Sequence, residues 1–76
     1  MDKNFVDDVR QMMDITNNTH FGTSIVSDEY APKIFDAIAE DVAEDIKASA
    51  DAENFNNDDI RLAVGRVLAK RLGIEI

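Results

Sequence analysis

The residues best suited to act on another molecule are carboxylates, and they concentrate in the middle of the chain. Between residues 28 and 59, eleven acids stand against two bases. Several of these acids recur at intervals of four residues, which places them on the same side of a helix. Five of them are referred to as the acidic face: Asp36, Glu40, Asp41, Glu44 and Asp45.

The acidic face has three interpretations. A run of charge on a helix is commonly only a solvated surface. It also suits a recognition surface for a protein partner, in particular a basic one. The third interpretation is an imitation of the phosphate row of DNA, as in an inhibitor or regulator of a nucleic-acid-binding protein. The net charge of −8 repels nucleic acids and anionic membranes, so we expect neither to be a direct partner.

A cluster of bases lies near the C-terminal end of the sequence. Its members are Arg61, Arg66, Lys70 and Arg71. They suit ion pairs with the acidic face or with a partner subunit, or contact with an external anion. No aromatic residues are interleaved with them for base stacking, which makes the cluster a weak nucleic-acid footprint.

Catalytic and metal-binding patterns are not found. His20 is the only histidine, and no cysteine accompanies it as a metal ligand. Hydroxyl residues lie near His20, but no nucleophile motif supports a catalytic pair. A calcium loop beginning at Asp51 would have Phe55 at its fifth position and Leu62 at its twelfth, where oxygen ligands are required. We therefore predict a protein that is not an enzyme and has no cofactor.

The pattern of apolar residues predicts an all-α domain with three helices. We expect them over residues 4–16, from Ser27 to Asp51 with a start anywhere up to Ala31, and from Asn57 to Leu72. The intervening segment 17–27 has the composition of a loop, and its Ser24-Ile25-Val26 piece has β-branched character suited to a short strand pairing.

Local signals set the ends of these helices. Two adjacent asparagines, Asn17 and Asn18, are expected to end the first helix. Ser27 or Asp28 is expected to cap the second. The third has agreeing signals at both ends, with Asn56 as a candidate cap and Gly73 as a left-handed terminator.

Each predicted helix carries an apolar stripe for one shared core. The first stripe contains Phe5, Val6, Val9, Met12, Met13 and Thr16. The second, on the side opposite most of the acids, contains Tyr30, Ile34, Phe35, Ile38, Val42, Ile46 and Ala50. The third contains Ile60, Ala63, Val64, Val67, Leu68 and Leu72. Gly65 interrupts the third helix and is expected to mark either a close helix crossing or no special feature.

The order of these elements resembles the histone fold, which is the alternative layout. The segment Phe55 to Val64, with the sequence FNNDDIRLAV, resembles the turn and the opening of the third helix in that family. The resemblance implies that Ile25-Val26 and Asn54-Phe55 approach as paired loops and that the chain dimerises. The central helix is shorter here and the basic DNA-contacting loops are absent, so no DNA-binding role is implied.

The size and composition of the chain indicate its domain number, oligomeric state and location. The 76 residues, 1–76, form one small domain with no linker and no repeat. A second copy would bury more apolar surface, which makes a homo-oligomer the expected state. Without cysteine, a signal-peptide pattern or an apolar run of about 18 residues, the expected location is the cytoplasm. The expected function is a non-enzymatic protein–protein interaction module, and the DNA mimic is its alternative.

Overall fold

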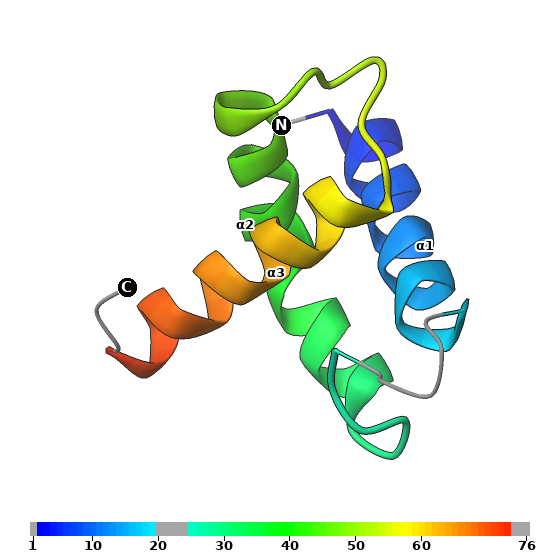
Figure 1. Cartoon of the computed structure of the whole chain (residues 1–76), viewed down its shortest axis with the longest axis vertical. Coiled ribbons are helices and arrows are strands. Elements are labelled where there is room, and N and C mark those ends of the chain that lie inside the picture. The colour runs from blue at the N-terminus through cyan, green and yellow to red at the C-terminus, as the bar shows by residue number, and fades with distance from the viewer. Residues whose placement is uncertain (1, 20–24, 74–76) are drawn as a thin grey trace.

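The computed structural model describes residues 2–19 and 25–73, and these form three helices (Figure 1). Helix α1 spans Lys3–Thr19, α2 spans Ala31–Ser49 and α3 spans Asn57–Leu72. The predicted all-α class is therefore confirmed. All three helices contact one another, and α3 crosses α2 so that its C-terminal end projects away from α1 (Figure 1).

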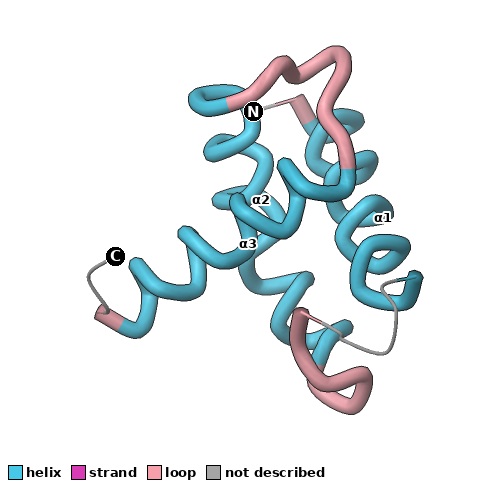
Figure 2. The backbone as a smooth tube through the Cα atoms, in the orientation of Figure 1, coloured by secondary structure: helices cyan, strands magenta, loops and turns pink. Residues whose placement is uncertain are grey.

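The connecting segments contain turns and bends but no strand within residues 2–19 and 25–73 (Figure 2). Ile25 and Val26 form a bend, and Ser24 lies outside the described residues. The short strand pairing is thus not confirmed. The three helices have similar lengths of 17, 19 and 16 residues, and the histone-like layout stays a prediction.

The predicted end of α1 is wrong, because the helix continues through Asn17 and Asn18 to Thr19. The Asn17 side chain is buried, and it binds the following loop instead of its own backbone. The Val26 N–H donates to Asn17 Oδ1 at 3.0 Å, and Asn17 Nδ2 donates to Asp28 Oδ1 at 3.3 Å. The Asn17 side chain therefore bonds the loop, and it does not compete for the backbone hydrogen bonds of its own helix as asparagine was expected to do.

The start of α2 lies at the last position of the expected range. Neither Ser27 nor Asp28 is its side-chain cap; the N-cap residue is Tyr30, which makes no capping hydrogen bond. The backbone carbonyl of Ser27 instead accepts from the N–H groups of Tyr30 and Ala31. Pro32 stands in the first turn, where the absence of its N–H removes no helical hydrogen bond.

The boundaries of α3 are those that the sequence predicts. Asn56 and Asp59 form a reciprocal capping box, with both side chain–backbone hydrogen bonds at 3.0 Å. Gly73 ends the helix at a φ of 75°, and its N–H donates to the carbonyls of Ala69 and Lys70. The left-handed backbone favours glycine because a β-carbon is strained there.

The core lies where the three stripes meet. Its buried apolar residues are Val9, Met13, Ala31, Phe35, Ile38, Ala39, Val42, Ala43, Ile46, Ile60, Ala63, Val64 and Val67. More than half belong to α2, so the central packing role of this helix is confirmed. Two stripe predictions are wrong, because Tyr30 is 57% exposed and Leu72 is 72% exposed. Tyr30 is the N-cap residue of α2, and Leu72 is the last residue of α3.

Within residues 2–19 and 25–73, no helix has the long, apolar stretch needed to cross a bilayer.

Candidate interaction surface

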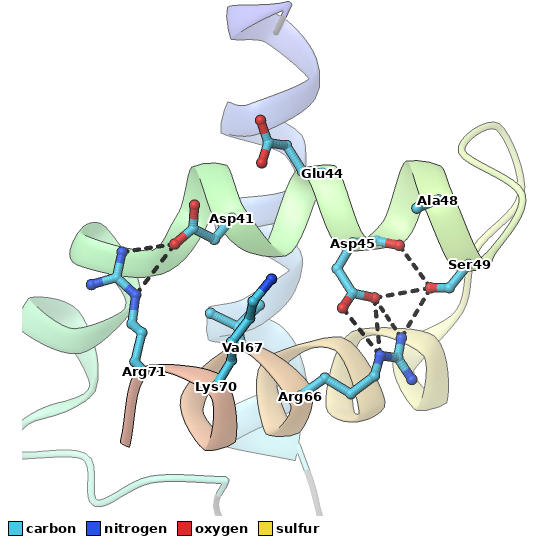
Figure 3. A pocket seen from close by; sticks show the side chains of 9 residues that line it. All are labelled: Asp41, Glu44, Asp45, Ala48, Ser49, Arg66, Val67, Lys70 and Arg71. Carbon is cyan, nitrogen blue, oxygen red and sulfur yellow. Dashed lines mark hydrogen bonds and ion pairs between the residues drawn. The ribbon is translucent and has the colours of Figure 1, made fainter. Parts of the chain in front are cut away.

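The acidic face and the basic cluster meet along the crossing of α2 and α3. Arg71 Nη2 donates to Asp41 Oδ2 at 2.7 Å, and Arg66 Nη2 donates to Asp45 Oδ1 at 2.6 Å (Figure 3). Intrachain pairing, one interpretation of the basic cluster, therefore holds for Arg66 and Arg71. Each pair is partly exposed, so its contribution is small, on the order of 1 kcal/mol or less.

The Asp45 pair is the more extensively bonded of the two. Arg66 Nε lies 3.1 Å from both carboxylate oxygens of Asp45, and Ser49 Oγ donates to Oδ1 at 2.9 Å. The hydrogen bond from Arg66 lowers the pKa of Asp45, and the Ser49 bond and the nearby positive charge of Lys70 act in the same direction against the effect of burial. Asp45 is thus held in its ionised form.

Arg10 of α1 neutralises a third member of the acidic face, and the sequence analysis missed it. Its Nε donates to Asp36 Oδ1 at 2.8 Å, and it also forms an ion pair with Asp14. Burial lowers the pKa of Arg10, but the hydrogen bonds to Asp14 and Asp36 and the attraction of their negative charges together outweigh burial and raise it. The guanidinium stands 5.5 Å from the centroid of the Phe35 ring, at cation–π distance.

One sequence signal was available for Arg10. Asp14 follows it by four residues, the spacing of a helical ion pair. The contacts to Asp36 and Phe35 had no such signal, because α1 and α2 are separated by a loop and their relative position comes from packing.

Glu40 and Glu44 are the unpaired members of the acidic face. Both side chains are exposed, and neither makes a hydrogen bond or ion pair with any residue in 2–19 or 25–73. In Figure 3 the Glu44 carboxylate points away from the two arginines. The five predicted acids therefore separate into three that arginines hold in place and two that are free to contact another molecule.

A cleft with a volume of about 470 Å³ runs beside the two ion pairs. Asp41, Glu44 and Asp45 line one side and Arg66, Lys70 and Arg71 the other, so its formal charges balance. Lys70 lies between the two arginines and points toward α2 (Figure 3). The remaining predicted base, Arg61, is half-buried and does not line the cleft. Two of the four members of the basic cluster, Arg66 and Arg71, are therefore paired with acids of α2.

The described part of the chain contains no cluster of side chains arranged as a metal site, and the candidate catalytic residues of the sequence cannot be placed in it. His20 and the neighbouring Thr23 and Ser24 lie outside the described residues. Within 2–19 and 25–73, no group of three or more histidine, cysteine, aspartate or glutamate side chains is arranged to hold a metal ion. The acidic residues are dispersed along α2 and do not converge on one point.

Comparisons with protein-family models, with curated proteins and with solved structures found no match to this chain.

Proposed function

We propose that the protein is a non-enzymatic interaction module of the cytoplasm, which binds a basic protein partner through its acidic face and also associates with copies of itself. The single observation that carries the proposal is the state of Glu40 and Glu44. Both are exposed and unpaired, one helical turn apart, on a helix whose neighbouring acids are already occupied by arginines.

The packing of α2 supports this function in a second way. Its buried side lies in the core shared with α1 and α3, so the two glutamates stand on a packed helix and not on a loop. A pre-ordered charged surface loses less conformational entropy when it binds than a mobile one does. An acidic surface also accelerates the encounter with a basic partner and suppresses encounters with acidic ones.

The DNA-mimic alternative receives less support. A mimic needs a dense row of unpaired negative charges, comparable to phosphates along a strand. In the acidic face, Asp36, Asp41 and Asp45 are each paired with an arginine. On this face the unpaired charge that remains is that of Glu40 and Glu44, one helical turn apart, which suits recognition of a few basic side chains.

The proposal is tested with a charge-reversed chain, Glu40→Lys combined with Glu44→Lys. The matched control is Glu29→Lys with Glu53→Lys, which changes the net charge equally at exposed positions outside α2. Each chain is immobilised and exposed to the same mixture of proteins. The proteins that each chain retains are then compared by quantitative mass spectrometry. We expect a basic protein that the wild-type and control chains retain and the α2 variant loses.

Equal retention by the two variants would refute the role of the acidic face. A partner that duplex DNA displaces from the wild-type chain would instead support the DNA-mimic alternative. Circular dichroism of each variant establishes that the helices are intact, so a loss of binding is assigned to charge.

A further inference from the structure

Arg71 occupies a member of the acidic face in the way that an external ligand would. Its Nη2 donates to Asp41 Oδ2 at 2.7 Å and to the Ala37 carbonyl at 3.3 Å, and its Nε donates to Asp41 Oδ2 at 3.3 Å (Figure 3). A guanidinium presents several N–H groups in a fixed planar arrangement, whereas an ammonium is a compact point charge. The chain itself therefore shows which side chain this part of α2 accommodates, namely an arginine.

The contact between Arg71 and Asp41 is the one most open to exchange with an external cation. Among the three arginines on the acidic face, the exposed fraction of the side chain is 50% for Arg71, 43% for Arg66 and 20% for Arg10. Asp41 is itself 46% exposed. Water screens the attraction within an exposed ion pair, so such a pair is weak.

The part of α3 that carries Arg71 lies beyond the buried core. Val67 is the last buried apolar residue of the helix, and the next residue, Leu68, is only partly buried. Lys70 and Leu72, on either side of Arg71, are exposed. The C-terminal end of α3 also projects away from α1 (Figure 1). The Arg71 side chain can therefore leave Asp41 without a change in the core.

Release of Asp41 would enlarge the unpaired part of the acidic face. Asp41 directly follows Glu40 and precedes Glu44 by three residues, a spacing at which side chains of a helix are neighbours. Three unpaired carboxylates would then be grouped on α2 in place of two. A larger group of like charges attracts a polycation more strongly.

We propose that Arg71 is an internal competitor for the binding surface, and that the partner is an arginine-bearing segment that replaces Arg71 on Asp41 while it contacts Glu40 and Glu44. This rests on the proposed function and identifies both the side chain that the partner supplies and a third residue that receives it. Binding exchanges one arginine–carboxylate contact for another, so the internal pair weakens the binding of the partner. For an exposed ion pair, this reduction in affinity is about two- to fivefold.

The test measures the dissociation constant of the full chain for a labelled oligoarginine peptide with blocked termini, by fluorescence anisotropy at low ionic strength. Arg71→Gln removes the internal competitor. The matched control is Lys3→Gln, which removes one positive charge at an exposed position of α1. We expect Arg71→Gln to bind about two- to fivefold more tightly than the wild type, and Lys3→Gln to bind nearly as the wild type does.

Two double variants separate the contact from the net charge. Asp41→Asn added to Arg71→Gln restores the wild-type net charge of −8 and removes the released carboxylate. Glu53→Gln added to Arg71→Gln restores the same net charge and leaves Asp41 in place. We expect the first double variant to lose the gain in affinity and the second to keep it. Oligolysine of the same length is expected to show a smaller gain, because an ammonium cannot reproduce the contacts of a guanidinium.

The outcomes separate this inference from the proposed function. If Glu40→Lys combined with Glu44→Lys binds oligoarginine as well as the wild type does, the function proposed for the acidic face fails. If that variant loses binding but Arg71→Gln binds no more tightly than Lys3→Gln, the competition by Arg71 is refuted alone. A gain that survives Asp41→Asn refutes it equally. An equal gain for oligolysine refutes the assignment of arginine as the side chain that the partner supplies.

Discussion

Two glycines of α3 allow the same substitution to be made with opposite expected results. Gly65 lies in the exposed middle of the helix, and Gly73 lies at its end with a φ of 75°. At both positions an added β-carbon would meet no atom within 4 Å. Changing each to alanine therefore isolates the backbone conformation, because side-chain packing is the same in both cases.

The expected magnitudes follow from that difference. Gly65→Ala replaces a residue of low helix propensity by the one of highest propensity, and it raises the free energy of unfolding by about 1 kcal/mol. Gly73→Ala forces a β-carbon into the left-handed region and lowers the free energy of unfolding by about 1–2 kcal/mol. For a domain of this size, 1 kcal/mol shifts the midpoint of thermal unfolding by about 4–8 °C.

Urea unfolding followed by circular dichroism measures both changes, with thermal unfolding as a second readout. Each chain is measured at several concentrations, because self-association would stabilise the folded state and make the apparent free energy of unfolding depend on concentration. The values extrapolated to low concentration belong to the single chain.

Destabilisation of the chain by Gly65→Ala at low concentration would contradict the first expectation, because it would mean that another element contacts α3 at Gly65. A neutral effect of Gly73→Ala would contradict the second, since the left-handed end of α3 would then contribute nothing. The sign of each change, as well as its size, is therefore diagnostic.

The remaining predictions concern tertiary contacts. A double-mutant cycle of Asp45→Asn and Arg66→Met should give a coupling of about 0.5–1 kcal/mol in the free energy of unfolding, since the pair is partly exposed. Because the folded pKa of Asp45 lies below its ordinary value, this stabilisation should be complete above about pH 4 and disappear as the pH falls through the folded pKa. Urea unfolding at a series of acidic pH values measures it. The expectation is contradicted if the difference in the free energy of unfolding between the wild type and Asp45→Asn does not narrow as the pH falls. Asn17→Ala leaves the Val26 N–H without its acceptor and should lower the free energy of unfolding by about 1–3 kcal/mol. An amide hydrogen exchange rate at Val26 that is the same in the variant and the wild type would argue against this contact. Arg10→Met keeps a long apolar chain over the core but loses the ion pairs, so calorimetry should find a smaller loss of stability than for Arg10→Ala. Equal losses of stability would mean that the packing of the Arg10 side chain contributes nothing.

The sequence predicted the features that depend on neighbouring residues in the chain. The Asn56 cap, the residues of α3 and its left-handed end at Gly73 were all predicted, because each is set by bonds that span only a few residues. The membership of the core was largely predicted for the same reason, since helical periodicity places apolar residues on one side. The failures at Asn17 and at the cap of α2 have the opposite cause: distant groups compete for the same polar side chains.

Some features of the candidate surface were likewise predicted from the sequence, and others depend on the fold. The density and spacing of its acids can be read from the sequence, which assigned all five to one side of a helix. Which of them are paired was decided by the crossing of the helices: Arg10, Arg66 and Arg71 reach Asp36, Asp45 and Asp41, respectively. These partners are 21 to 30 residues apart in the chain, so no local spacing encodes them.

The sequence by itself thus determined three amphipathic elements, their most regular ends and a strongly acidic middle, because these follow from short-range hydrogen bonding and periodicity. Only the tertiary structure decided that Glu40 and Glu44 are the unpaired members of the acidic face and that Leu62 and Leu72 are exposed. The physical reason is that exposure and ion pairing depend on the crossing and register of packed helices. Those are set by the core as a whole and not by any one segment.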